Sequence, residues 1–117
     1  MDAANVRRST WPNIAPEELV VLCRAWAAAE RVHAVVVFDG AAPTRDDTGP
    51  VELVSTGAGS ADDWIADEAA RLGAEGAPHW LVTSDRELRE RAGTGALRTI
   101  GGGSLARTLL GLRGSSG

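Results

Sequence analysis

The chain has 117 residues, of which 44% are hydrophobic and 24% charged, a balance typical of one folded domain with its own core. All 12 basic residues are arginines, and the lack of lysine excludes a P-loop and a Schiff-base enzyme, because both need a lysine side chain. The net charge of −4 does not favour a nucleic-acid binder unless bound cations offset part of it. With no apolar run that could span a bilayer, no secretory signal and a single cysteine, Cys23, we expect a cytoplasmic protein with one buried thiol.

The first half of the chain predicts one helix followed by two strands. Apolar residues recur at helical spacing over Glu17–Glu30, and Pro16 fits the first turn of this helix. The continuous apolar run His33–Phe38 is typical of a buried parallel strand. A loop rich in proline and charge covers 41–50, and Val51–Ser55 is the next short strand.

The second half continues the alternation of helices and strands. Ser60 is predicted to cap a helix, with Asp63 three residues later in a capping-box pattern. The later elements are a strand at Trp80–Thr83, a helix at Asp85–Ala92, a strand at Leu97–Ile100 and a helix at Ser104–Leu112. Alternating strands and helices predict a mostly parallel sheet covered on both faces. Residues 1–112 would form this single domain, and 113–117 a disordered tail.

Acidic residues stand at four points where a predicted strand ends or a helix begins: Asp2, Asp39, Asp62 and Asp85. The carboxyl ends of parallel strands share one edge of a sheet, so these side chains are expected to converge there. Converging carboxylates repel one another unless a cation lies between them, and such oxygen ligands suit Mg²⁺ or Mn²⁺. Each aspartate also has a structural interpretation, because aspartates are common in turns and as helix caps. The capping box explains Asp63 but does not need Asp62, which is therefore the better candidate for a metal ligand.

Candidates for phosphate and base contacts lie near these acids. Ser84 and Arg86 flank Asp85, and an arginine fork pairs well with phosphate, although a solvated arginine is the commoner outcome. The glycine turns at 57–60 and 101–104 each precede a helix, which is a weak sign of phosphate binding. Trp11 and Trp64 are near the acidic edge and are candidates for stacking on bases.

Taken in order, these motifs resemble the NYN branch of the PIN-like nucleases, in particular the YacP-like family. The matching segments are Asp2-Ala-Ala-Asn5-Val6, Val36-Val-Phe-Asp39-Gly40, Ser60-Ala-Asp62-Asp63-Trp64-Ile65, Val82-Thr-Ser-Asp85-Arg86-Glu87-Leu88 and Ile100-Gly-Gly-Gly-Ser-Leu-Ala-Arg107. Two features differ from the family pattern. Met1 directly precedes Asp2, so the first strand is short or missing, and Ala66 stands where relatives often carry a glutamate.

The resemblance implies a three-layer α/β/α sandwich and a metal-dependent endoribonuclease of the cytoplasm. Its implied catalytic residues are Asp2, Asn5, Asp39, Asp62 and Asp85, of which the four aspartates would bind Mg²⁺ or Mn²⁺. Its expected substrate-binding residues are Ser84, Arg86, Arg45, Arg89 and Arg107. The expected partner is RNA, free or as mRNA on a translating ribosome, with no membrane partner and with a homodimer as an open possibility. Two alternatives stay open: a catalytically inactive RNA-binding module of the same fold, and a metal-dependent phosphatase.

Overall fold

The computed structural model describes residues 1–45 and 49–115, with the backbone alone at 114 and 115. It is an α/β structure of five helices and four strands within these residues. In chain order the elements are α1 Ala3–Arg7, α2 Pro16–Glu30, β1 Ala34–Phe38, β2 Val51–Ser55, α3 Ala61–Ala74, β3 Trp80–Val82, α4 Arg86–Ala92, β4 Arg98–Ile100 and α5 Gly102–Ser115. None of the helices in the described ranges is long and apolar enough to cross a membrane.

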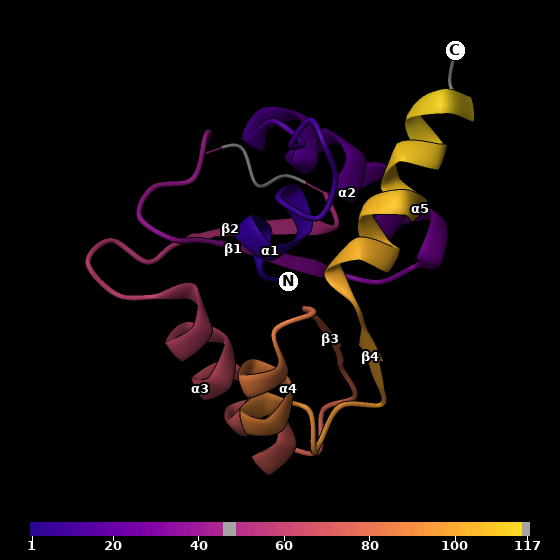
Figure 1. The fold of residues 1–117 in the computed structure, drawn as a ribbon. Helices are drawn as coiled ribbons and strands as arrows, with labels where there is room; N and C mark the ends of the chain where they lie inside the picture. Colours follow the sequence, from indigo (N-terminus) through magenta and orange to yellow (C-terminus); the bar gives the residue numbers. More distant parts are fainter. Residues whose placement is uncertain (46–48, 116–117) are drawn as a thin grey trace.

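The strands form two parallel pairs. In one pair β1 lies beside β2, with Ala34 opposite Val51, and in the other β3 lies beside β4, with Trp80 opposite Arg98. The sequence predicts a single sheet, whereas the described strands form two separate two-stranded sheets. Figure 1 shows the β1–β2 pair and the β3–β4 pair in separate parts of the molecule, with the N-terminus between them.

Met1 and Asp2 connect the two pairs. The Met1 ammonium donates to the Val35 carbonyl (2.8 Å), and the Met1 carbonyl accepts from the Val37 N–H (2.9 Å). On the other side the Asp2 N–H donates to the Val82 carbonyl (3.2 Å). Two residues therefore take the place of a strand between β1 and β3, as a single parallel bridge from Asp2 to Val37.

Two apolar clusters lie against alternate faces of β1, as the two-residue period of a strand requires. The larger cluster contains Val36 and Phe38 and is covered by α1, α2 and α5. The smaller contains Val37 and is covered by α3 and α4 through Ile65 and Leu88. Helices on both faces explain why the β1 run is continuously apolar.

Two helices, α1 and α5, differ from what the sequence predicts. The five-residue helix α1 is not predicted, because it is too short to show an apolar period. Helix α5 extends to Ser115, three residues into the expected disordered tail, and Arg113 pairs there with Glu18 of α2. Residues 116 and 117 of that tail lie outside the described part of the chain.

Candidate functional site

Three of the four predicted acids bind the first turn of a helix. Asp2 Oδ1 accepts from the Asn5 N–H at the start of α1 (3.3 Å), and Asp85 Oδ1 accepts from the Leu88 N–H at the start of α4 (3.0 Å). Asp39, which follows β1, accepts from the Ala61 N–H at the start of α3 (2.7 Å). Each carboxylate thus satisfies a helix N–H that has no partner within its helix. The predicted cap is confirmed for Asp85, while the bonds of Asp2 and Asp39 to helix N–H groups are not predicted; each bond uses one of the two carboxylate oxygens.

Asp62, in the first turn of α3, has no such structural role. Its carboxylate makes no hydrogen bond or close ion pair within residues 1–45 and 49–115, and it is partly exposed. Burial first, and then the negative charges of Asp85 and Asp39, raise the pKa of Asp62, against a smaller opposing effect of Arg91. Asp39, which follows β1, and Asp85, which follows β3, therefore interact electrostatically with Asp62.

Asp2 belongs to the same group. It is buried, at 7% exposure, and burial is the main cause that raises its pKa. The hydrogen bond from Asn5 lowers this pKa, while the charges of Asp62 and Asp39 raise it further. Asp2 and Asp62 thus both feel repulsion from neighbouring carboxylates, as expected for acids gathered at one edge.

The donor set suits a hard divalent cation, because it consists of carboxylate oxygens whose mutual repulsion a cation would relieve. In the described ranges, however, no three His, Cys, Asp or Glu side chains already lie together as a ready set of metal ligands. Binding a cation would therefore need side-chain rotation to draw the carboxylates closer.

Asn5 and Ser84 hold three elements together beside the acids. Asn5 Oδ1 accepts from the Ser84 N–H (2.8 Å), which ties α1 to the loop after β3. Ser84 Oγ accepts from the Gly102 N–H at the start of α5 (2.7 Å). These two residues are expected to position water and phosphate, and the structure gives both of them a structural role as well.

The predicted arginines are all exposed but differ in how they are held. Arg89 donates from Nε to the Thr83 carbonyl (3.0 Å), and Arg107 donates to Ser104 Oγ (3.4 Å). Arg86 begins α4 directly after Asp85, and Arg45 lies in the loop between β1 and β2. Arg89 is thus anchored near Asp85, and Arg86 is its neighbour in the sequence.

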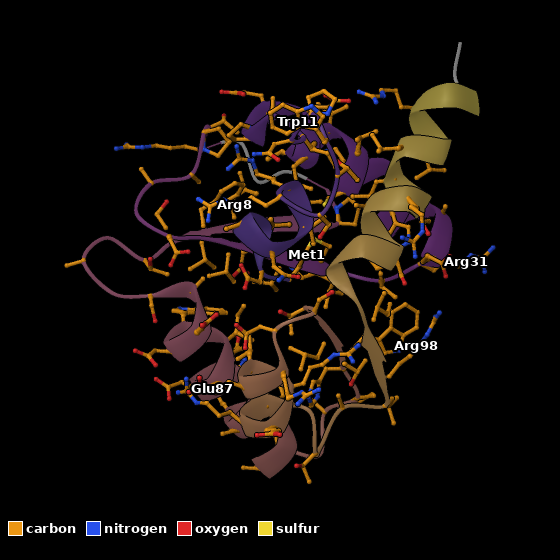
Figure 2. All side chains as sticks on the ribbon, in the orientation of Figure 1. Met1, Arg8, Trp11, Arg31, Glu87 and Arg98 are labelled. Carbon is orange, nitrogen blue, oxygen red and sulfur yellow. The ribbon has the colours of Figure 1, made fainter. Side chains whose placement is uncertain are left out.

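The expected phosphate contacts before helices find other partners. Thr83 is fully buried, and its hydroxyl accepts from the Asp85 N–H (3.1 Å), so it is not available to a ligand. The Gly57 N–H donates to the Gly40 carbonyl (3.0 Å). Of the two tryptophans considered for stacking, Trp11 is 91% exposed, on the loop before α2 (Figure 2).

Sequence reasoning missed Arg91. Its Nη2 atom lies 3.1 Å from Asp63 Oδ1, which pairs α4 with the start of α3. Ser60 does cap α3 by accepting from the Asp63 N–H (3.1 Å), as predicted. The Asp63 carboxylate, however, is occupied by Arg91, so the capping box forms only in part. No sequence signal identifies this pair, because 28 residues separate its members.

Comparison with family models, curated proteins and solved structures finds no match to this chain.

Proposed function

We propose that this protein is a metal-dependent endoribonuclease of the NYN branch, on a three-layer α/β/α sandwich in which Met1 and Asp2 lie between β1 and β3. One observation carries the proposal: the Asp62 carboxylate makes no hydrogen bond within the described residues, and its pKa is raised first by burial and then by the charges of Asp85 and Asp39. A folded protein normally avoids such repulsion unless the acids serve a function.

Asp2, Asp39, Asp62 and Asp85 would hold one or two Mg²⁺ or Mn²⁺ ions. Such ions activate a water and stabilise the leaving oxygen of a phosphodiester. The caps on Asp2, Asp39 and Asp85 orient these carboxylates, and each cap leaves one oxygen for a cation. Asn5 and Ser84 keep α1 and the loop after β3 at a fixed separation.

The arginines would bind the RNA backbone. Arg86 and Arg89 stand beside Asp85, Arg107 lies one turn into α5, and Arg45 follows β1. Contacts of this kind give affinity for phosphates without reading the base sequence. A cation at the acids would also reduce the repulsion between the RNA and a chain of net charge −4.

An inactive RNA-binding module is the second candidate, favoured because no three metal-ligand side chains lie together among the described residues. The test is to incubate the protein with a labelled single-stranded RNA in Mn²⁺, in Mg²⁺ and in EDTA. Cleavage that requires the metal and is lost in Asp62→Asn supports the nuclease. RNA binding without cleavage in either metal supports the inactive module.

A further inference from the structure

Trp11 is the most exposed of the large hydrophobic side chains in the described structure, and it lies on the loop between α1 and α2 (Figure 2). The other three tryptophans, Trp26, Trp64 and Trp80, belong to the apolar clusters or pack against them. A single exposed apolar residue is common on a protein surface, so the surroundings of Trp11 decide what it can do.

The loop that carries Trp11 lies against the start of α5. Ser9 Oγ donates to the Asn5 carbonyl (2.5 Å), which holds the beginning of this loop on α1. A Cβ on Gly102 would lie 3.2 Å from Ser9 Oγ, and one on Gly103 would lie 3.9 Å from Ser9 Cβ. Trp11 follows Ser9 by two residues, so their Cα atoms are at most about 7 Å apart. The exposed ring therefore stands near the first turn of α5.

Two arginines reach the same turn of α5 from different helices. A Cβ on Gly103 would lie 3.7 Å from Nη1 of Arg107, which belongs to α5 itself. A Cβ on Gly101 would lie 3.9 Å from Nη2 of Arg89, which belongs to α4. Within residues 1–45 and 49–115, neither guanidinium pairs with a carboxylate, and each donates to one neutral oxygen. Each therefore keeps its charge and further N–H donors, which fit a phosphate.

From these arginines the surface continues to the acids. Arg89 belongs to the helix that Asp85 caps, and Ser84 just before it accepts from the Gly102 N–H (2.7 Å). An aromatic ring, two arginines and an acid thus follow one another across α1, α5 and α4. Aromatic rings for the bases and cations for the backbone are the arrangement by which proteins bind single strands. A duplex does not fit it, because its bases are paired and stacked inside the helix.

We propose that the substrate is single-stranded RNA, with one base stacked on Trp11 and the neighbouring backbone phosphates bound by Arg107 and Arg89. The choice of RNA as the nucleic acid rests on the proposed function. The phosphate to be cleaved would lie beyond Arg89, at Asp85 and the other acids. Every base has a π-face, so stacking on Trp11 adds affinity without a strong preference for one sequence.

The first test measures binding of a labelled oligouridylate of about twelve nucleotides, within the usual size of single-strand sites. EDTA is present, so that binding is measured without metal-dependent cleavage. Trp11→Ala should weaken binding about 5- to 150-fold, as the loss of one base–aromatic stack does. Trp11→Phe should lose less, because it keeps a ring. The affinity for a fully paired duplex of the same length should not respond to Trp11→Ala. Because Trp11 is exposed, both variants should keep the melting temperature of the parent.

Arg107→Ala and Arg98→Ala form a matched pair, because they remove the same charge at different places. Arg107 is in the first turns of α5, whereas Arg98 of β4 covers the Trp80 ring, 4.9 Å from its centre, and lies apart from Trp11 (Figure 2). Arg107→Ala should reduce the slope of log Kd against log salt by about 0.7, the value for one phosphate contact of a single strand. Arg98→Ala should leave this slope unchanged.

The proposal is overturned if the protein does not bind the single strand, or if Trp11→Ala binds it as tightly as the parent. Equal losses in Trp11→Ala and Trp11→Phe, or equal salt slopes in Arg107→Ala and Arg98→Ala, would overturn it too. The cleavage test in Mn²⁺ separates it from the proposed function. Binding that depends on Trp11 without any cleavage would refute the nuclease alone. Cleavage with binding that is independent of Trp11 would refute this inference alone.

Discussion

Asp62 and Asp63 are neighbours on α3 but differ in what holds their carboxylates. Asp63 is paired with Arg91, whereas Asp62 is without a partner in the described ranges and is repelled by Asp85 and Asp39. We predict that Asp62→Asn reduces metal-dependent RNA cleavage at least about 100-fold, the upper end found for residues that support a metal. In EDTA this variant should be no less stable than the parent.

Asp63→Asn is the matched control for that prediction. It should keep cleavage within a few fold of the parent and lower the free energy of unfolding by about 0–1 kcal/mol, as for other exposed ion pairs. Cleavage rates and urea denaturation of both variants test whether Asp62 and Asp63 have these different roles. Similar losses of cleavage in both would show that Asp62 has no special role.

The two acids with raised pKa values predict an unusual pH dependence. Asp2 and Asp62 hold protons in the folded state at pH values where the unfolded chain, with a pKa near 3.8, has released them. Their contribution to stability is therefore complete below about pH 3.8 and is lost as pH rises through the folded pKa values. In EDTA, Asp2→Asn/Asp62→Asn should flatten this loss, and asparagine preserves the cap at Asp2.

Mn²⁺ should reverse the loss in the parent protein and not in the double variant, because a cation favours the charged form of the acids. Denaturant titrations from pH 4 to 7, with EDTA and with Mn²⁺, measure both effects. An equal Mn²⁺ response in parent and double variant would place the cation elsewhere.

At the scale of the elements, α1, α5 and the loop after β3 meet at Asn5. A Cβ on Gly102 would lie 2.1 Å from Asn5 Oδ1, and the Ser84 N–H holds that oxygen in place. We predict that Gly102→Ala lowers the free energy of unfolding by about 1–3 kcal/mol, as overpacking usually does. The double variant Asn5→Ala/Gly102→Ala removes the clash and should lose less than the two single changes added together.

Gly103→Ala is the control, because the nearest atom to its Cβ would be Arg107 Nη1 at 3.7 Å. Within a helix this change should be neutral or stabilise by up to about 1 kcal/mol. Urea denaturation of the four variants measures the set. Equal stability of Gly102→Ala and Gly103→Ala would mean that Asn5 moves freely.

The elements themselves follow from local patterns to different degrees. The valine run of β1 and the apolar period of α2 place both elements to within a residue, because a buried strand and a long amphipathic helix carry strong signals. The burial expected for Cys23 is confirmed, since it is fully buried, and this burial raises its pKa to about 12. The links from Asn5 to Ser84 and from Asp63 to Arg91 join distant segments, and no local pattern encodes them.

At the scale of the molecule, the two strand pairs are joined by the backbone of Met1 and Asp2 and by the two apolar clusters, each of which contains residues of both pairs. The electrostatic influence of Asp39 and Asp85 on Asp62 agrees with the rule behind the prediction, that the ends of parallel strands converge. The place of Met1 and Asp2 between the two pairs could not be foreseen, since it depends on where β1 and β3 lie relative to each other. Homodimer formation stays a prediction, to be decided by sedimentation of the protein at several concentrations.

The last prediction concerns the place of Met1 between the strand pairs. An apolar extension of about five residues before Met1, a usual strand length, would continue the path of Met1 and Asp2 between β1 and β3. It would also convert the buried amine into an amide. The amine, with an unfolded pKa of 8.0 and a folded pKa of about 6, contributes stability above pH 8 that is lost as pH falls toward 6.

The extended protein should therefore melt at a higher temperature and lose the decline in stability between pH 8 and 6. Because Asp2 is continuous with this strand, metal-dependent cleavage should rise with stability. An extension of five alternating glycines and serines is the control, since it removes the free amine without adding apolar side chains between β1 and β3. If both extensions stabilise equally, the amine alone explains the effect. If the apolar extension leaves stability unchanged, no strand forms between β1 and β3.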